Sequence, residues 1–520
     1  MCPTSHGDSR SYVILMAFRT PGASMSPPPA SPPPLRGKIV IGAAWMVATR
    51  WSHRLLGLVS TMILARLLMP EDFGLVATVA AVVAIIDGFF DFGFDLALIH
   101  DQRAGRPEFD AAWTLRLIKS VCFGALLMLA APWMADYANA PEIVGISLVM
   151  GASIAIKGLE NIGTVTFQRE LEFDRLFRFR LIPRLMGVVT TIALALALRS
   201  YWAIVIGSFA RYAYEVAFSY SMSPYRPRLR LQGIGRLWQF SRWILVTNIA
   251  RQLFNATDRF ILTGLIPKRT LGFYSVGADV ASTVTVDLMS PAGSALAPGF
   301  AKLQNEPERL RNAFLISTSI FVALITPATI GLWCVAPELT AVILGAQWDG
   351  AAPLIGLFAF VWLFYALSEN LGRFMTMTGL QAAAAIVGLL RTLLFLGLLF
   401  PVFQRGGLEA LILMKAALSA IEVVALTGIC ARRLGLPLHQ TPALFWRPAL
   451  AAGGMAALLM LAPFPADWPA LVALAVKVTA GALAYTAGSV LLWQLSGKPF
   501  GLESTVVGII RKRCGAANAA

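Results

Sequence analysis

The feature that most constrains this chain is a succession of apolar segments, each about 19–25 residues long and able to cross a bilayer as a helix. Only 14% of the 520 residues are charged and 57% are hydrophobic, whereas soluble domains carry about 25% charged residues. The sequence therefore predicts an all-α polytopic membrane protein with about 14 transmembrane helices. The expected spans are residues 40–68, 73–99, 113–135, 142–167, 181–198, 201–222, 239–266, 271–297, 312–335, 351–371, 380–401, 407–430, 445–463 and 469–494.

The basic residues between the spans set the expected orientation. With the N-terminus inside, 25 Lys and Arg residues lie in cytoplasmic segments and five (Arg66, Arg199, Lys268, Arg269 and Arg405) on the opposite side. This excess is the positive-inside pattern, and it requires an even number of spans. Both termini are therefore expected in the cytoplasm, with twelve or sixteen spans as alternatives. The same distribution explains the net charge of +15 by topology and anionic lipid, so we expect no nucleic-acid partner.

Three basic residues interrupt the stretch Ala44–Leu68 of the first span. Arg50, His53 and Arg54 have the spacing i, i+3, i+4 and project from one side of a helix. A cation near the bilayer centre costs at least about 2.5–3.5 kcal/mol, so these side chains should face a water-filled cavity or a partner. The alternative is that they reach the cytoplasmic headgroups.

The first and seventh spans repeat one pattern at an offset of 198 residues. Trp45 aligns with Trp243, Thr49 with Thr247, and Gly74 with Gly272. Because the offset contains six spans, the two halves insert in the same orientation, as parallel repeats do. We therefore predict two six-helix bundles and an accessory C-terminal pair. The expected division is 1–37 (disordered cytoplasmic tail), 38–236 (first bundle), 237–435 (second bundle), 436–496 (accessory pair) and 497–520 (cytoplasmic tail).

The seventh span carries a polar stripe of its own. Arg251, Asn255, Asp258 and Arg259 lie at helical steps, and Arg251 is equivalent to His53. Both halves thus present basic groups at matching depth, as expected of two stripes that line one cavity. The alternative is a structural pairing of Arg251 with Asp258 or Asp87. We also expect Arg211 to pair with Glu215, and Glu369 with Arg373, because each pair is spaced i, i+4.

Carboxylates within the spans are candidates for ion coupling or for charge pairing. They include Asp87 and Asp91 of the second span, Glu160 of the fourth and Asp258 of the seventh. The five cysteines show no CxxC pair and no metal-ligand spacing. We expect no metal and no cofactor, with a proton or a sodium ion as the only coupled species. The segment 169–184 is expected to form an amphipathic helix in the membrane interface.

Four blocks resemble the lipopolysaccharide and exopolysaccharide flippases of the MOP superfamily. They are MILARLLMPEDFGLVATVAAV (62–82), FQRELEFDRLF (167–177), LGFYSVGADV (271–280) and APGFAKLQNEPERLR (297–311). The likeness covers residues 38–440. It implies two six-helix lobes around a cationic cavity in the bacterial inner (plasma) membrane, working by alternating access. The implied cargo is a polyprenyl-pyrophosphate-linked oligosaccharide, and the implied partners are membrane lipid, a polysaccharide polymerase and a chain-length regulator.

No family motif assigns the site, so its residues rest on the charge pattern. We expect Arg50, His53, Arg54, Arg251 and Arg259 to hold the pyrophosphate, since arginine forms bidentate hydrogen bonds with phosphate. A multidrug exporter or a lipid II-type flippase of the same superfamily is the alternative, although a drug-cation cavity should be acidic. An enzyme is not expected, because the longest outer loop, 336–350, is mostly apolar.

Overall fold

The structure is a computed structural model that describes residues 35–89, 98, 105–170, 172–232, 249, 251–287, 300, 303, 306–437, 444–465 and 467–497. The chain divides into two units, residues 1–41 and 42–520. Of the first unit only the opening turns of the first helix are described. The rest of this section concerns the second unit. The expected tails, 1–37 and 497–520, and Asp91 lie almost entirely outside the described residues.

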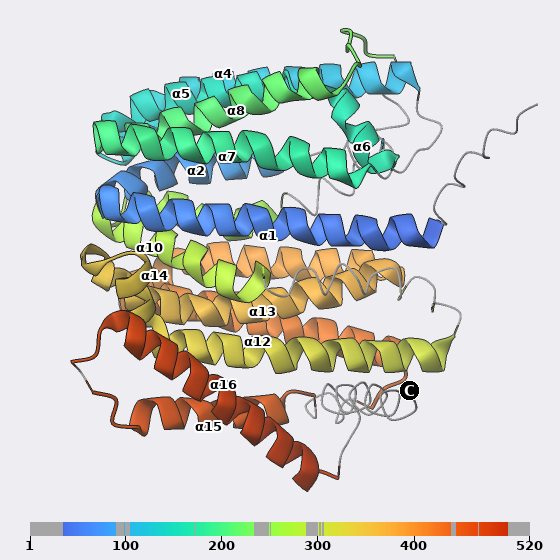
Figure 1. Cartoon of the computed structure of the whole chain (residues 1–520), viewed down its shortest axis with the longest axis vertical. Coiled ribbons are helices and arrows are strands. Elements are labelled where there is room, and N and C mark those ends of the chain that lie inside the picture. Colours follow the sequence, from blue (N-terminus) through green and yellow to red (C-terminus); the bar gives the residue numbers. More distant parts are fainter. Residues whose placement is uncertain are drawn as a thin grey trace, which may run out of the picture. The chain divides into compact units, whose positions relative to one another are not determined.

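The first half of the second unit is a bundle of helices in which α4 packs on α5, α5 on α8 and α8 on α7 (Figure 1). Apolar side chains from α2, α4 and α5, among them Val79, Leu127 and Ile143, form its core. Its elements are α1 (Leu35–Leu67), α2 (Pro70–Phe89), α4 (Arg106–Tyr137), α5 (Glu142–Lys157), η1 (Ile162–Thr164), α6 (Val165–Arg169), α7 (Phe173–Leu198) and α8 (Trp202–Met222).

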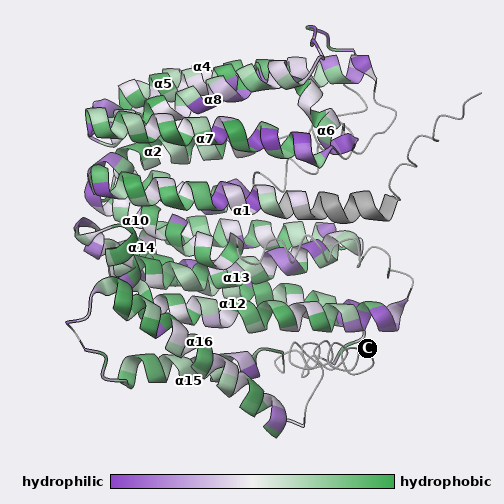
Figure 2. Ribbon diagram, in the orientation of Figure 1, coloured by the Kyte–Doolittle hydropathy of each residue, from purple (hydrophilic) through white to green (hydrophobic). Residues whose placement is uncertain are grey.

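The second half repeats this arrangement, with α13 packed on α10, α12 and α14, while α15 and α16 pack together against α12. Figure 2 shows hydrophobic residues over most of these helices and hydrophilic ones gathered toward their ends. After a helix over residues 251–263, the elements are α10 (Lys268–Ser282), η2 (Thr283–Asp287), α12 (Pro307–Ile343), η3 (Ala346–Ala351), α13 (Ala352–Met377), α14 (Gln381–Arg433), α15 (Trp446–Leu461) and α16 (Ala470–Leu495).

The helices follow the expected spans closely in most places. Six described helices are long and apolar enough to cross a membrane, and the pair α5 and η1–α6, bent by 63°, makes a seventh. The number fourteen therefore stays a prediction. The long helix α14 contains a break at Gly407, where φ is 64° and ψ is −154°. This break falls where the sequence separates the spans 380–401 and 407–430.

The predicted interface helix over 169–184 is wrong. A short break follows α6, and from Phe173 onward α7 continues without interruption to Leu198. Pro183 lies inside this helix and does not end it. Arg184 therefore belongs to a long bundle helix. The amphipathic pattern that suggested an interface location comes from the polar end of α7, where Arg178 pairs with Asp174 at 3.0 Å.

The two halves meet where α2 crosses α10. A Cβ atom added at Gly74 would lie 2.0 Å from the Lys268 carbonyl oxygen, and one added at Gly272 would lie 2.0 Å from that of Pro70. Positions 70 and 268, like 74 and 272, differ by the repeat offset. The two contacts are therefore exchanged by a two-fold relation between the repeats, as in an isologous interface. The two backbones touch here, and only glycine fits.

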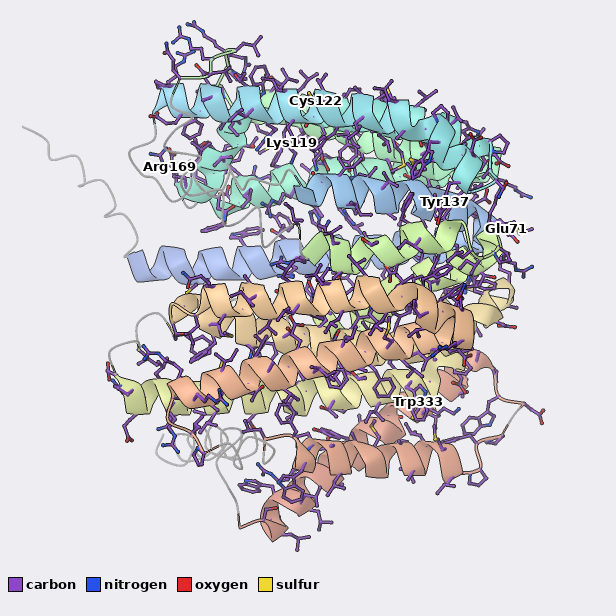
Figure 3. The ribbon with its side chains drawn as sticks, turned by 180° about the vertical axis from the view of Figure 1, so that it is seen from behind. Glu71, Lys119, Cys122, Tyr137, Arg169 and Trp333 are labelled. Carbon is purple, nitrogen blue, oxygen red and sulfur yellow. The ribbon has the colours of Figure 1, made fainter. Side chains whose placement is uncertain are left out.

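Further contacts tie the halves together at this same end. The Tyr137 hydroxyl donates a 2.9 Å hydrogen bond to the Ile261 carbonyl, and Trp348 Nε1 donates a 2.8 Å bond to the Ala65 carbonyl. Thus a side chain of each half donates a hydrogen bond to a carbonyl near the C-terminal end of the other half's first helix. Glu71 and Tyr137 lie at this end of the bundle, whereas Arg169 lies at the other (Figure 3). The structure is closed at the end that holds the start of α2 and α10.

Candidate functional site

The basic residues of α1 face both halves of the protein. Arg50 interacts electrostatically with Glu369 of α13. Arg54 interacts with Asp279 of α10 and is also close enough to Arg184 of α7 for their charges to interact. A Cβ atom at Gly57 would lie 3.4 Å from Nη2 of Arg184, so that guanidinium rests directly on α1. Arg50 and Arg54 therefore come together with a third arginine, from α7, that the sequence prediction assigned to the interface.

His53 faces charged groups of the first half and shares one of them, Arg184, with Arg54. Its charged neighbours are Arg180, Arg184 and Arg211, all from α7 and α8 of the first half. Its Nε2 atom is buried and has no hydrogen-bond partner among the described residues. Successive helix residues are rotated by about 100°, so His53 lies further from Arg54 around the helix than Arg50 does. The surroundings of the three residues therefore overlap: Arg50 and Arg54 also face carboxylates of the second half, whereas the charged neighbours of His53 are arginines of the first.

Glu369 is the centre of a second basic group. Its carboxylate lies 4.0 Å from Nη2 of Arg251 and 3.8 Å from Nη2 of Arg373, and it also interacts with Arg50. These arginines come from three helices. A cavity of about 280 Å³ adjoins the group and is lined by Arg251, Glu369 and Arg373 together with Tyr365 and Arg391. Positive charge from the helix over 251–263 and from α13 therefore lines this cavity, and Arg50 of α1 interacts with the cavity's carboxylate, Glu369.

Other charges in the second half form tight pairs. Asp258, 1% exposed, accepts hydrogen bonds from Lys415 Nζ and the Tyr274 hydroxyl, both at 2.6 Å. Arg391 of α14 donates a 2.5 Å bond to Glu422. Arg259 donates a 2.8 Å bond to Asp279, which compensates its charge. The first two pairs are buried and hold helices together, since a buried charge is stable only when it is paired, whereas Asp279 in the third is 67% exposed.

The pairings show which of the expected contacts form. The pairing of Arg251 with Asp258 or Asp87 is wrong, because Asp258 binds Lys415 and Asp87 lies 3.3 Å from Lys119. Glu160 lies 3.8 Å from Arg116. The expected pair of Arg211 and Glu215 is present at 2.8 Å. That of Glu369 and Arg373 is also present, although Glu369 is shared with Arg251.

Three of the residues in these groups were not anticipated as site residues. Arg184 was assigned to the expected interface helix over 169–184, Arg373 to an i, i+4 pair with Glu369, and Lys415 to no partner. Lys415 and Asp258 are 157 positions apart, so no local spacing joins them. A usable signal existed only for Arg373, because it lies one helical turn from Glu369, a carboxylate inside the expected span 351–371.

One polar cluster lies outside the spans, at the end of the first half that carries Arg169. Asp110, fully buried, accepts a 2.7 Å hydrogen bond from the Tyr225 hydroxyl and a 3.0 Å bond from the Arg228 amide. Burial and this hydrogen bond raise the pKa of Tyr225. The cluster anchors the segment that follows α8 to the start of α4.

Comparison with known proteins now defines the class. The solved structure of the lipid II flippase MurJ in an inward closed conformation matches with a TM-score of 0.67 at 14% identity, covering 87% of this chain and 99% of that one. A multidrug resistance MATE family transporter of the MOP superfamily, inward-facing, matches with a TM-score of 0.57 at 13% identity, covering 80% and 100%. At these identities the likeness concerns the fold. The predicted all-α fold of two bundles with an accessory pair is confirmed.

Residues 63–353, more than half of the chain, match the family described as polysaccharide biosynthesis protein, and the chain belongs to that family. The succinoglycan biosynthesis transport protein ExoT of Rhizobium meliloti is 26% identical over 317 residues, which are 61% of this chain and 64% of ExoT. The lipopolysaccharide biosynthesis protein WzxC of Escherichia coli is 22% identical over 386 residues, covering 72% and 76%. The family and the described apolar helices make the chain a multi-pass membrane protein of polysaccharide biosynthesis, and the name of ExoT, a transport protein, agrees with the prediction of a transporter rather than an enzyme.

Proposed function

We propose that the protein moves a polyprenyl-pyrophosphate-linked oligosaccharide, a building unit of a surface polysaccharide, from the cytoplasmic to the outer leaflet of the inner membrane. The observation that carries this proposal is that Arg251 and Arg373 line one cavity together with Glu369, a carboxylate that also interacts with Arg50. The names of ExoT and WzxC, which refer to succinoglycan and lipopolysaccharide, support a polysaccharide cargo.

The chemistry of the group suits a diphosphate. Both phosphates of such a lipid are esterified, so each keeps one acidic oxygen and about one negative charge near neutral pH, and arginine binds phosphate oxygens through two parallel hydrogen bonds. Removing such a headgroup from water is the costly step of transport, and a cationic cavity replaces its hydration. The prenyl chain stays in the lipid while the sugar occupies the wet space. Arg54, with Arg184 beside it, extends the basic surface along α1.

The orientation and the cycle follow from charge and symmetry. With both termini in the cytoplasm, the closed end at α2 and α10 faces outward, so this conformation awaits cargo from the cytoplasmic side. Alternating access then separates α2 from α10 and closes the opposite end. We expect coupling to a proton or sodium gradient, and cooperation with a polymerase and a chain-length regulator. A rate of transport in liposomes that is the same with and without a proton or a sodium gradient would refute this coupling.

The test in cells uses a strain that lacks the gene and a plasmid that restores it. Arg54→Ala and Arg251→Ala should each abolish surface polysaccharide while the protein stays in the membrane. Arg178→Ala, on the exposed end of α7, is the matched control and should restore export. Normal export by both single variants and by their double variant would refute the assignment.

A multidrug exporter remains the competing function because a MATE transporter shares the fold. The basic cavity argues against it, since drug cations would be repelled. The deletion strain distinguishes the two: a polysaccharide flippase gives loss of surface polymer at unchanged drug sensitivity, and a drug exporter gives the reverse.

A further inference from the structure

Glu369 lies among three arginines, yet it is held loosely. Its distances to Arg251 and Arg373 are 4.0 and 3.8 Å, beyond hydrogen-bonding range. The other ion pairs of this half differ. In the pairs Asp258–Lys415 and Arg391–Glu422 the charged atoms are 2.6 and 2.5 Å apart. A carboxylate placed to fasten helices would be expected to resemble these.

Exposure separates the same two groups. The side chains of Glu369 and Arg251 are 30% and 45% exposed, and that of Arg373 is 28% exposed. Those of Asp258 and Lys415 are 2% and 6% exposed. An exposed ion pair contributes little to stability, whereas a buried pair cannot lose one member cheaply. Another anion can therefore take the place of Glu369 beside its arginines, whereas none can take the place of Asp258 beside Lys415.

We propose that Glu369 is an internal counter-anion, which occupies Arg50, Arg251 and Arg373 in the empty transporter and yields them to the diphosphate of the substrate. This inference rests on the proposed function and adds a positioning residue to it. Three arginines and one glutamate leave a net charge of +2, which matches a diphosphate diester of about two negative charges. With the glutamate in place, the arginines stay near one another without a bound anion.

The cavity offers the displaced carboxylate of Glu369 an alternative hydrogen-bond partner. Gln381 lines the same cavity, and its side-chain amide carries two N–H donors. Glu369 can turn toward this amide when the diphosphate arrives. When the substrate leaves, Glu369 returns to the arginines and competes with rebinding. Tight binding alone does not speed a cycle, so a built-in competitor favours release at the outer face.

The test measures binding and transport in the full-length protein. The probe is undecaprenyl diphosphate in detergent micelles for binding, and the same lipid carrying a sugar in liposomes for transport. Glu369→Gln should bind the probe about tenfold more tightly, because a competing charge about 4 Å from the arginines is gone. The same variant should transport several times more slowly, since release no longer has a competitor. Glu369→Asp, which keeps the charge, should stay close to wild type.

Glu172→Gln is the matched control, because Glu172 also pairs with an arginine, Arg175, at 3.0 Å but lies at the exposed end of α7. It should change neither quantity. Unchanged or weaker binding by Glu369→Gln, with wild-type binding intact and lowered by Arg251→Ala, would overturn the counter-anion alone. Failure of both Glu369 variants to fold would show a structural pair and would also overturn it. Absence of probe binding by the wild type would overturn the proposed function itself.

Discussion

The crossing of α2 and α10 offers the sharpest test of the closed end. Gly74→Ala places a methyl group 2.0 Å from the Lys268 carbonyl oxygen, whereas an ordinary contact begins near 3.4 Å. The two helices must therefore separate by about 1.4 Å. Overpacking of this kind costs about 1–3 kcal/mol. Gly272→Ala makes the symmetric contact with Pro70 and should cost about the same.

The separation should also open the closed end. The bonds from Tyr137 to Ile261 and from Trp348 to Ala65 flank the crossing, and a shift of this size lengthens them beyond hydrogen-bonding range. Thr78 lies one turn after Gly74 on α2 and is only 2% exposed. The separation of the helices makes it accessible. The assay is labelling of Thr78→Cys by a membrane-impermeant maleimide, in a background without the native cysteines.

We expect labelling from the outer face to rise in Gly74→Ala and in Gly272→Ala, with a lower unfolding temperature in detergent. The double variant should cost less than the sum of the two, because both changes relieve their clash by the same movement. Gly428→Ala is the control, since nothing lies within 4 Å of a Cβ atom there. Unchanged stability and unchanged labelling in both single variants would refute the close packing of α2 on α10.

Three further predictions follow from particular side chains. Lys415→Met leaves Asp258 buried without its cation and should destabilise the protein by about 3–5 kcal/mol in thermal unfolding, with partial recovery in the double variant Asp258→Asn, Lys415→Met. Arg184→Ala should weaken binding of undecaprenyl diphosphate, whereas Arg178→Ala on the same helix should not; equal effects would contradict the placement of Arg184 beside Arg54. Because the pKa of Tyr225 is raised in the folded protein, its contribution is complete below about pH 10 and is lost as the pH rises above that value. Tyr225→Phe should cost about 1–3 kcal/mol and remove this pH dependence of the unfolding temperature.

The repeat and the main helices could be predicted because they depend on local patterns. Apolar length marks the spans, and the offset of 198 residues places Gly74 opposite Gly272. The break at Gly407 was also foreseen from the composition around it. These features are set by the residues of one segment and its copy, so no knowledge of distant contacts was needed.

The partners within the site could not be predicted in the same way. Arg50 and Arg54 were found because charge inside a span is costly, yet nothing in the sequence says that Glu369 and Asp279 face them. His53 shares their spacing and still points toward α7 and α8. Arg184 was misplaced because the polar end of α7 has the amphipathic pattern of an interface helix. Spacing along one helix shows which residues share a side, whereas the packing of helices decides what that side meets.

The most direct test of the central claim is a transport assay with purified protein in liposomes. The cargo is an undecaprenyl-diphosphate-linked oligosaccharide that is labelled in one leaflet, and its appearance in the other leaflet is measured over time. We predict that the wild type transfers the lipid and that Arg251→Ala transfers it at the rate of empty liposomes. We also predict that the undecaprenyl lipid without its diphosphate neither moves nor competes. Equal transfer by wild type and Arg251→Ala, or equal transfer of the lipid without diphosphate, would contradict a diphosphate held by these arginines.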